Sequence, residues 1–485
     1  MNTYLLALQL MAFQGCLGAF DTLYHHELSE ALPGRTSARL ELSIYAVRAL
    51  IYSALFIGLS AWRFHGLWAL ALLALLALLI IEIALTLWDF VVEDRTRLLP
   101  ATERVTHTVL AMNGGAFFML LVLETPDWLA LPTALVWQPH GALSVFLALC
   151  GIGVGISGLR DGCAALALRR QGERDAAVPA PLFGAGERSF LVTGATGFIG
   201  QKVVRALLDG GHRVTVLTRQ ARQAAWLFDG RVECITGMGQ LSPTRRIDVV
   251  INLAGASILG WRWTSARRAA LRKSRVDLTD DVIAWIGAAE HKPALMLSAS
   301  AIGYYGIQRP GDATELTEDH PAQALFMSDL CRQWEIAAHG AARYGVAVVC
   351  MRLGVVLGNQ GALPMMLLPV RLGLGGALGG GAQWLSWIHV EDVIGAMGHL
   401  CRAGQAGVYN LTAPHSVTQR QFSRTAAQVL GRPCAVPTPG WPLRLALGEQ
   451  ADLLLEGQRV APARLVASGF RFAYPELGPA LKSLV

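Results

Sequence analysis

Three glycines spaced three apart follow a short apolar segment and have the spacing of a phosphate-binding turn. The apolar segment ends at Thr193. The first glycine would let the chain turn off a strand, the second would let backbone N–H groups approach a pyrophosphate, and the third would let the next helix lie close to the sheet. The phosphates would then meet the unpaired amides at a helix N-terminus. We predict a dinucleotide site at Gly194, Ala195, Thr196, Gly197, Phe198, Ile199 and Gly200.

The end of the next expected strand indicates which dinucleotide would bind. An acidic residue that would hold a ribose 2′-hydroxyl is absent there, and Thr218 and Arg219 stand in its place. An arginine at this position suits a 2′-phosphate, although an ordinary surface arginine is the alternative. We therefore predict that NADP(H) is preferred over NAD(H). Leu253, Ala254 and Gly255 follow another expected strand and would border the adenosine half.

The elements that would position this turn form a βαβ pattern. A helix is expected over 198–208, and strands and helices alternate beyond it. This alternation predicts an α/β, Rossmann-type, doubly wound parallel sheet with a small C-terminal substrate lobe. The glycine-rich run 373–381 is expected to form a loop over the site. After the strand that ends at Thr193, the expected strands cover residues 212–218, 232–235, 248–253, 294–298, 346–352 and 408–411.

The first third of the chain is predicted to be an α-helical membrane bundle. Of the 485 residues, 53% are hydrophobic and only 16% are charged, which is too apolar for an ordinary soluble enzyme. The excess lies before residue 165, in about five segments long enough to cross a bilayer. We expect spans over 4–24, 40–61, 67–90, 105–123 and 142–159, and domains over 1–160 (membrane), 161–187 (linker), 188–435 (NADP-binding) and 436–485 (C-terminal).

The arginines predict the orientation of this bundle. They are concentrated in the connections after the first and third spans and in the segment after the fifth. Positive charge accumulates on the cytoplasmic side of membrane proteins. We therefore expect a bacterial inner-membrane protein with its N-terminus outside and its nucleotide domain in the cytoplasm.

The sequence gives little support for a disulfide framework, a structural zinc site or a nucleic-acid site. The eight cysteines are scattered without a CxxC pair, so neither a disulfide framework nor a structural zinc site is indicated. The net charge of +6 comes almost wholly from arginine and forms no basic stripe interleaved with aromatic residues, so we expect no nucleic-acid partner.

Ionisable residues gather at one end of the expected spans. Spacings of four or seven place them on helix faces, and alternating span directions bring them to the cytoplasmic end of the bundle. Carboxylates and histidines from facing helices can build metal sites, so a metal or quinone-type redox site is one hypothesis. Salt-bridged interfacial residues are the alternative. The candidate metal ligands are Asp21, His25, Glu82, Glu103 and His107.

Several longer motifs together resemble one known family. TGATGFIG, INLAGASI, SASAIGYYG, RLGVVLGNQGALPMML and RLGLGGALGGGAQWLSWIHVEDV resemble the extended short-chain dehydrogenase/reductase superfamily, and more narrowly its atypical epimerase-like branch, also labelled NAD-dependent epimerase or cell-division inhibitor-like. The ending LLEGQRVAPARLVASGFRFAYPELGPAL is similar to that branch's own C-terminal domain. The resemblance covers about residues 189–485. It implies a Rossmann domain that binds NADP(H) and a substrate lobe, but it names no substrate.

The chain departs from this superfamily at its Tyr-x-x-x-Lys pair. The resemblance implies that tyrosine acts as the acid/base while lysine lowers its pKa and holds the ribose. If Glu335 is taken as the glutamate that usually follows, Met327 and Cys331 occupy the two places. No lysine occurs in 293–481, so a displaced copy of the pair is excluded there.

Two residues after the expected strand 294–298 remain candidates for catalysis. Ser300 matches the superfamily's catalytic serine, with a strand cap as the alternative. Tyr304, or its neighbour Tyr305, could supply a phenol from another direction, with packing in the site wall as the alternative. The substrate side could be lined by Trp261, Trp263, Trp384, Trp387 and His389, although the tryptophans could equally form core and the histidine could fix the lobe.

Two functions follow from these patterns. The first is a membrane-anchored NADP(H)-dependent epimerase or oxidoreductase acting on a small or lipid-like molecule, which the retained serine and tyrosines favour. The second is a regulatory module that senses the nucleotide without turnover, which the missing Tyr/Lys pair favours.

Overall fold

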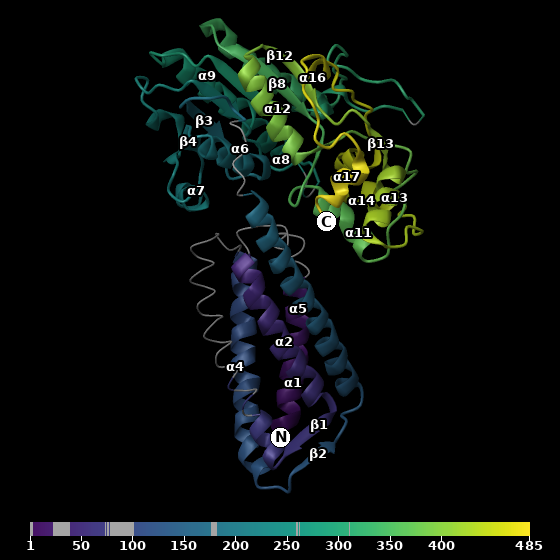
Figure 1. Ribbon diagram of the computed structural model, residues 1–485. Coiled ribbons are helices and arrows are strands. Elements are labelled where there is room, and N and C mark those ends of the chain that lie inside the picture. Colours follow the sequence, from purple (N-terminus) through teal and green to yellow (C-terminus); the bar gives the residue numbers. More distant parts are fainter. Residues whose placement is uncertain are drawn as a thin grey trace. The chain divides into compact units, whose positions relative to one another are not determined.

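The computed structural model divides the chain into two units, Met1–Ala177 and Val178–Val485. It describes residues 3–22, 39–72, 74, 77, 101–175, 182–258, 260, 262–309 and 311–485, with backbone only for 39–41, 101–103 and 167–175. Figure 1 shows long helices in the first unit and a sheet flanked by helices in the second.

Where the structure describes it, the first unit is helical, with one short antiparallel pair of strands, β1 and β2. Among the described residues, four helical segments are long and apolar enough to cross a membrane: Thr3–Phe20, Leu42–Ala61, Arg104–Leu129 and Ala142–Leu166. They correspond to four of the five expected spans, and most of the remaining one, 67–90, lies outside the described residues. The elements are α1 (Thr3–Phe20), α2 (Arg39–Ala61), β1 (Trp62–His65), α4 (Ala101–Leu129), β2 (Ala134–Trp137) and α5 (Ala142–Asp175).

Glycines allow α2 and α5 to approach closely. A Cβ atom added at Gly151 would lie 2.7 Å from a side-chain carbon of Ile57, and one at Gly158 would lie 2.7 Å from the Cβ of Ala49. At the same interface the Ser53 hydroxyl donates to the Gly151 carbonyl over 2.7 Å. Small residues at an interface let two helix backbones approach closely enough for such contacts.

The second unit contains a seven-stranded parallel sheet, which confirms the doubly wound prediction. The strand order is β12-β8-β7-β6-β3-β4-β5, so the chain extends the sheet in one direction from β3 and then returns to extend it from β6. The strands are β3 (Ser189–Thr193), β4 (Arg213–Leu217), β5 (Glu233–Ile235), β6 (Val249–Asn252), β7 (Leu295–Ala301), β8 (Ala347–Leu353) and β12 (Gly407–Leu411).

Apolar side chains on both faces of this sheet account for its burial. Because successive strand residues point to opposite faces, Val192 and Ile251 pack with α6 and α12, whereas Leu191 and Val250 pack with α9 and α10. The helices are α6 (Phe198–Asp209), α7 (Ala221–Leu227), α8 (Ser265–Lys273), α9 (Val276–Ala288), α10 (Phe326–His339), α11 (Leu363–Arg371), α12 (Val390–Ala403), α13 (Gln419–Leu430), α14 (Trp441–Leu447), α15 (Asp452–Leu455), α16 (Ala463–Ala467) and α17 (Leu477–Lys482).

Later segments form a lobe beside the sheet. Figure 1 shows α11, α13, α14 and α17 gathered there. The buried Asp392 carboxylate accepts the backbone N–H groups of Ala473 and Tyr474 over 2.7 and 3.0 Å, which fixes the C-terminal segment to α12. The lobe also contains two small two-stranded sheets formed by β9 (Val355–Leu357) with β11 (Trp387–His389) and by β10 (Trp384–Leu385) with β13 (Val417–Thr418).

His389 connects α12 to the C-terminus. Its Nδ1 accepts the Glu391 N–H over 3.2 Å as a helix cap, and its Nε2 lies 3.2 Å from the Ser483 hydroxyl. The side chain is only 1% exposed. Burial, together with the charge of Lys202, lowers the pKa of His389 from 6.5 to about 4. The folded state therefore takes up a proton less readily than the unfolded state.

We predict that stability falls as the pH drops from about 6.5 towards about 4, by about 1.4 kcal/mol for each pH unit at most. His389→Asn keeps a capping oxygen but does not titrate, so its thermal midpoint should fall less over this window. Thermal unfolding of both full-length proteins at neutral and acidic pH measures the difference. Equal losses would contradict the role of His389.

Candidate nucleotide and substrate site

The turn after β3 accepts only glycine at two positions. Gly194 has φ +70°, and a Cβ there would lie 2.7 Å from the backbone carbon of Leu253. A Cβ at Gly200 would lie 2.2 Å from the Gly194 carbonyl oxygen. A Cβ at Gly197 would lie 3.2 Å from the Gly194 carbonyl oxygen. The turn is therefore packed tightly against α6 and against the residues after β6, but it is less crowded at Gly197.

This turn lies where the direction of strand order reverses. Ligands of doubly wound sheets bind in the crevice outside the carboxyl ends of the strands at this point. The Thr193 hydroxyl, at the end of β3, donates to Asn252 Oδ1 over 2.7 Å and accepts the Ala254 N–H over 3.1 Å. These two bonds fix the residues after β6 beside the glycine turn.

Thr218 and Arg219 follow β4 at the same edge of the sheet. The Thr218 hydroxyl accepts the Gln220 N–H over 3.1 Å, which shapes the turn. Arg219 is exposed and forms no ion pair with any residue that the structure describes. Its charge is therefore free to meet an anion.

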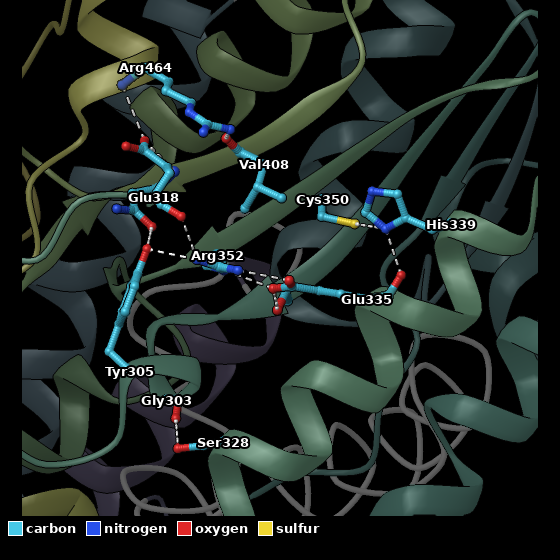
Figure 2. A network of polar contacts seen from close by, with 12 residues as sticks. Gly303, Tyr305, Glu318, Ser328, Glu335, His339, Cys350, Arg352, Val408 and Arg464 are labelled. Atoms are coloured by element: carbon cyan, nitrogen blue, oxygen red, sulfur yellow. Dashed lines mark hydrogen bonds and ion pairs between the residues drawn. The ribbon is translucent and has the colours of Figure 1, made fainter. Parts of the chain in front are cut away.

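Ser300 belongs to a buried polar network. It is 2% exposed, and its hydroxyl donates to Glu335 Oε1 over 2.6 Å. Glu335 also receives two bonds from Arg352, at 2.8 and 2.9 Å. Burial alone would lower the pKa of Arg352, but the hydrogen bonds and charge of Glu335 outweigh burial and raise it. Figure 2 shows Arg352 reaching from β8 to Glu335 on one side and towards Tyr305 on the other.

The two tyrosines of the 3₁₀ helix η5 (Ile302–Tyr305) differ in accessibility. Tyr305 is buried, donates to Asn410 Oδ1 over 2.7 Å and accepts from Arg352 over 2.9 Å. Tyr304 is half-buried, and the Arg352 guanidinium carbon lies 3.4 Å from the centre of its ring. Among the described residues the Tyr304 hydroxyl has no hydrogen-bond partner. Tyr304 is therefore the phenol of this pair that a ligand could reach.

The places of the absent Tyr/Lys pair lie on α10 next to η5. A Cβ added at Gly303 would lie 3.6 Å from Met327 and 4.0 Å from the sulfur of Cys331. Cys331 is fully buried, and burial together with Glu335 raises the pKa of its thiol to about 12. Cys331 is therefore a protonated packing residue rather than a thiolate at neutral pH.

Arg275 places a positive charge near this region that the sequence patterns did not single out. It is 7% exposed, donates to the Ala256 carbonyl over 3.0 Å, and lies 5.3 Å from the centre of the Trp334 ring. A Cβ at Gly255 would lie 2.9 Å from its guanidinium carbon. It forms no ion pair with a carboxylate among the described residues, and burial lowers its pKa. A buried, unpaired cation beside Gly255 favours an anionic ligand there.

Arg352 was also missed, although a signal was present. It is the one charged residue within the otherwise apolar strand 347–353. A charge in a buried strand requires a buried partner. That partner is Glu335, which the sequence patterns indicate only as the glutamate that follows the absent Tyr/Lys pair.

The aromatic residues expected on the substrate side separate into core and cavity positions. Trp387 is completely buried and donates to the His415 carbonyl over 3.1 Å, so it lines no site. Trp263 packs edge-on against Phe326. Trp384 lines a cavity in the C-terminal lobe. Trp261 lies outside the described residues.

The candidate metal ligands of the first unit are only partly described. Asp21 and His107 lie together, with Oδ2 and Nε2 3.2 Å apart. His25 and Glu82, as well as the side chain of Glu103, lie outside the described residues. Among the residues that are described, no group of three or more histidine, cysteine or acidic side chains is placed to hold a metal ion. The metal hypothesis stays a prediction.

Comparison with known proteins gives a consistent result for the second unit. Residues 190–412 match the NAD dependent epimerase/dehydratase family, and residues 438–484 match a domain of unknown function, DUF1731. The epimerase family protein YfhF of Bacillus subtilis is 39% identical over 296 residues, which are 61% of this chain and 97% of that protein. The mouse epimerase family protein SDR39U1 is 38% identical, over 61% of this chain and 99% of its own length.

One solved structure is similar in both sequence and fold. The human epimerase family protein SDR39U1, crystallised with NADPH, is 35% identical and superimposes with a TM-score of 0.55. The match covers 61% of this chain and 98% of that chain.

The glycine turn generates a prediction about stability. Gly200→Ala would force a Cβ to 2.2 Å from a backbone oxygen, so it should lower stability by about 1–3 kcal/mol. Gly197→Ala is the matched control and should cost less than about 1 kcal/mol, because its Cβ would lie 3.2 Å from the Gly194 carbonyl oxygen, a tight contact that a small shift relieves, and because its backbone is extended. Thermal unfolding of both variants tests this. Equal losses would show that the turn is not tightly packed.

Proposed function

This chain belongs to the NAD dependent epimerase/dehydratase family, and from that premise we propose that its second unit binds NADP(H) and transforms a small or lipid-like substrate. The observation that carries the proposal is the glycine turn at the switch point of the sheet. Gly194 brings the turn against the residues after β6, and Gly200 brings α6 against the turn. Backbone N–H groups at the start of α6 would then be available to a pyrophosphate.

The proposed cofactor site consists of three segments at the carboxyl ends of neighbouring strands. Residues 194–200 would hold the pyrophosphate, Thr218 and Arg219 a 2′-phosphate, and residues 253–255 the adenosine half. The exposed, unpaired Arg219 and the NADPH in the related human structure support this assignment. When bound, NADP(H) supplies or accepts a hydride.

The residues nearest to catalysis are proposed to be Tyr304 and Ser300. Tyr304 would donate or accept a proton, because its hydroxyl has no partner within the described structure. The positive charge of Arg352 against its ring would attract the negative charge that develops on the phenol oxygen. Ser300 would orient the substrate only if its hydroxyl gave up the hydrogen bond to Glu335 and formed one with the substrate instead. Arg275 would supply the buried positive charge that the absent lysine does not.

A regulatory module without turnover is the second candidate function. The observation that favours it is the burial of Ser300, whose hydroxyl is already committed to Glu335. With a methionine and a cysteine in place of the tyrosine and lysine, the unit could bind the nucleotide and report its presence without reaction. The activity of variants at Ser300 and Tyr304 distinguishes the two functions.

We also propose that the first unit anchors the chain in a membrane, a bacterial inner membrane in our interpretation. Four helical segments with the length and apolarity of spans support this, and the arginine distribution supports a cytoplasmic nucleotide unit and an external N-terminus.

Cofactor preference gives the first test. The full-length protein should bind NADPH more tightly than NADH, and Arg219→Ala should abolish most of this preference, because a charge-assisted contact to phosphate is lost. Titration of nucleotide fluorescence measures both affinities. Arg213→Ala is the matched control, because it removes the same charge from the opposite, amino end of β4 and should retain the preference. Equal affinities in the parent protein would refute the assignment.

Variants at the catalytic candidates give the second test. If turnover is found, Ser300→Ala combined with Tyr304→Phe should lower it by about 10²–10⁴-fold, the usual contribution of positioned acid/base groups. Cys331→Ala should change turnover little, since a buried thiol with a pKa of about 12 is not a nucleophile at neutral pH. A reaction that survives the double variant but is lost with Cys331→Ala would reverse these roles.

A further inference from the structure

Two short strands complete one end of the first unit. β1 follows α2 directly, because α2 ends at Ala61 and β1 begins at Trp62, and β2 ends at Trp137, shortly before α5 begins at Ala142. The strands pair antiparallel, with Trp62 opposite Trp137. Figure 1 shows this pair beside the start of α1. The β1/β2 pair therefore stands at the ends of two helices that are long and apolar enough to span a membrane.

One face of the β1/β2 pair is turned towards the helices. Successive strand residues point to opposite faces, and Arg63 lies on the inner face. Its guanidinium carbon is 4.7 Å from the centre of the Tyr4 ring and 5.8 Å from that of the Trp128 ring. The Tyr4 hydroxyl also donates to the Trp62 carbonyl over 3.3 Å. These contacts fix the pair to the start of α1 and the end of α4.

The opposite face of the β1/β2 pair is apolar at every position. The register places Trp62 beside Trp137 and Phe64 beside Leu135 on this face. The two indole rings meet edge to face at 4.9 Å, and Trp62, Leu135 and Trp137 are 38%, 40% and 60% exposed. The Phe64 ring folds back onto α2, because a Cβ at Gly58 would lie only 3.4 Å from it. The apolar face is therefore continuous with the surface of a span-length helix.

The backbone of the β1/β2 pair limits how deep this face can lie in a bilayer. A two-stranded sheet has two open edges, whose N–H and C=O groups need partners that hydrocarbon does not supply. Water and lipid headgroups supply them. The indole N–H groups indicate the same depth, since neither Trp62 nor Trp137 donates to a described residue, whereas the buried Trp285 and Trp387 donate to carbonyls over 3.0 and 3.1 Å. Tryptophan is enriched at the level of the headgroups for this reason.

The size of the face favours lipid over a second copy of the chain. Two paired strands of four residues each cover roughly 13 Å by 10 Å, which is about 130 Å². Each partner in a stable protein interface contributes about 800 Å². Lipid needs no such area, because the bilayer already surrounds the adjoining helices.

We propose that the apolar face formed by Trp62, Phe64, Leu135 and Trp137 is a phospholipid-binding surface that lies in the headgroup region, with its side chains against the upper part of the acyl chains. The inference rests on the proposed membrane anchoring and goes beyond it. It assigns a lipid contact to a part of the first unit outside the four spans, and this contact sets the depth of that end of the bundle.

The test measures tryptophan fluorescence of the full-length protein in phosphatidylcholine liposomes. One set of liposomes contains lipid brominated near the headgroup, and another contains lipid brominated near the ends of the acyl chains. The signal of Trp62 and Trp137 is the difference between the parent and the double variant Trp62→Phe with Trp137→Phe. The headgroup-proximal bromine should quench this signal at least about twofold more than the deep bromine, because interfacial tryptophan lies at headgroup level.

A matched double variant and a flotation assay complete the test. Trp226→Phe with Trp441→Phe removes two exposed tryptophans of the second unit, and neither lipid should quench their difference signal. Flotation of the liposomes after an alkaline carbonate wash shows separately whether the parent and both double variants are inserted. In protein that floats, a Trp62 and Trp137 signal that neither lipid quenches, or that the deep bromine quenches more, would overturn the inference. Parent protein that does not float would instead overturn the proposed membrane anchoring.

Discussion

The buried ion pair between Glu335 and Arg352 is the interaction on which the geometry of the second unit depends. Its two hydrogen bonds join α10 to β8 in the interior, where either charge alone would be strongly unfavourable. Removing one partner of such a pair usually costs about 3–5 kcal/mol. The pair also fixes β7 through Ser300 and η5 through Tyr305. Arg352 donates in addition to the Glu318 carbonyl. The Glu318 carboxylate in turn accepts the backbone N–H groups of Asn410 and Arg464.

This network and the glycine turn fix different sides of the proposed site. The turn fixes the proposed cofactor side by backbone packing alone, since Gly194 and Gly200 leave no room for a side chain. The network fixes the proposed substrate side by charge, and it leaves the Tyr304 hydroxyl without a partner among the described residues. Arg275 lies between the two, under Gly255 and against Trp334. A family member without the usual Tyr/Lys pair thus still contains a phenol on η5 and a buried cation at the residue that precedes α9.

Patterns in the sequence predicted the sheet well, because a buried parallel strand is a short apolar run and a glycine turn has fixed spacing. The seven strands lie close to the expected ranges. Side-chain partners could not be predicted in the same way. Nothing local to Ser300 indicates that its hydroxyl is taken by a residue 35 positions away, and nothing in the spacing of Trp384 and Trp387 shows that one lines a cavity and the other is core. Such facts depend on which helix covers which strand.

The central claim, that the carboxyl ends of β3, β4 and β6 form an NADP(H) site, is tested most directly by hydrogen–deuterium exchange of the full-length protein with and without NADPH. We predict slower exchange in residues 194–200, 218–219 and 253–255, and no change in the peptides of α1, α2, α4 and α5. Unchanged exchange in all three segments at saturating NADPH, or protection confined to other parts of the chain, would contradict it.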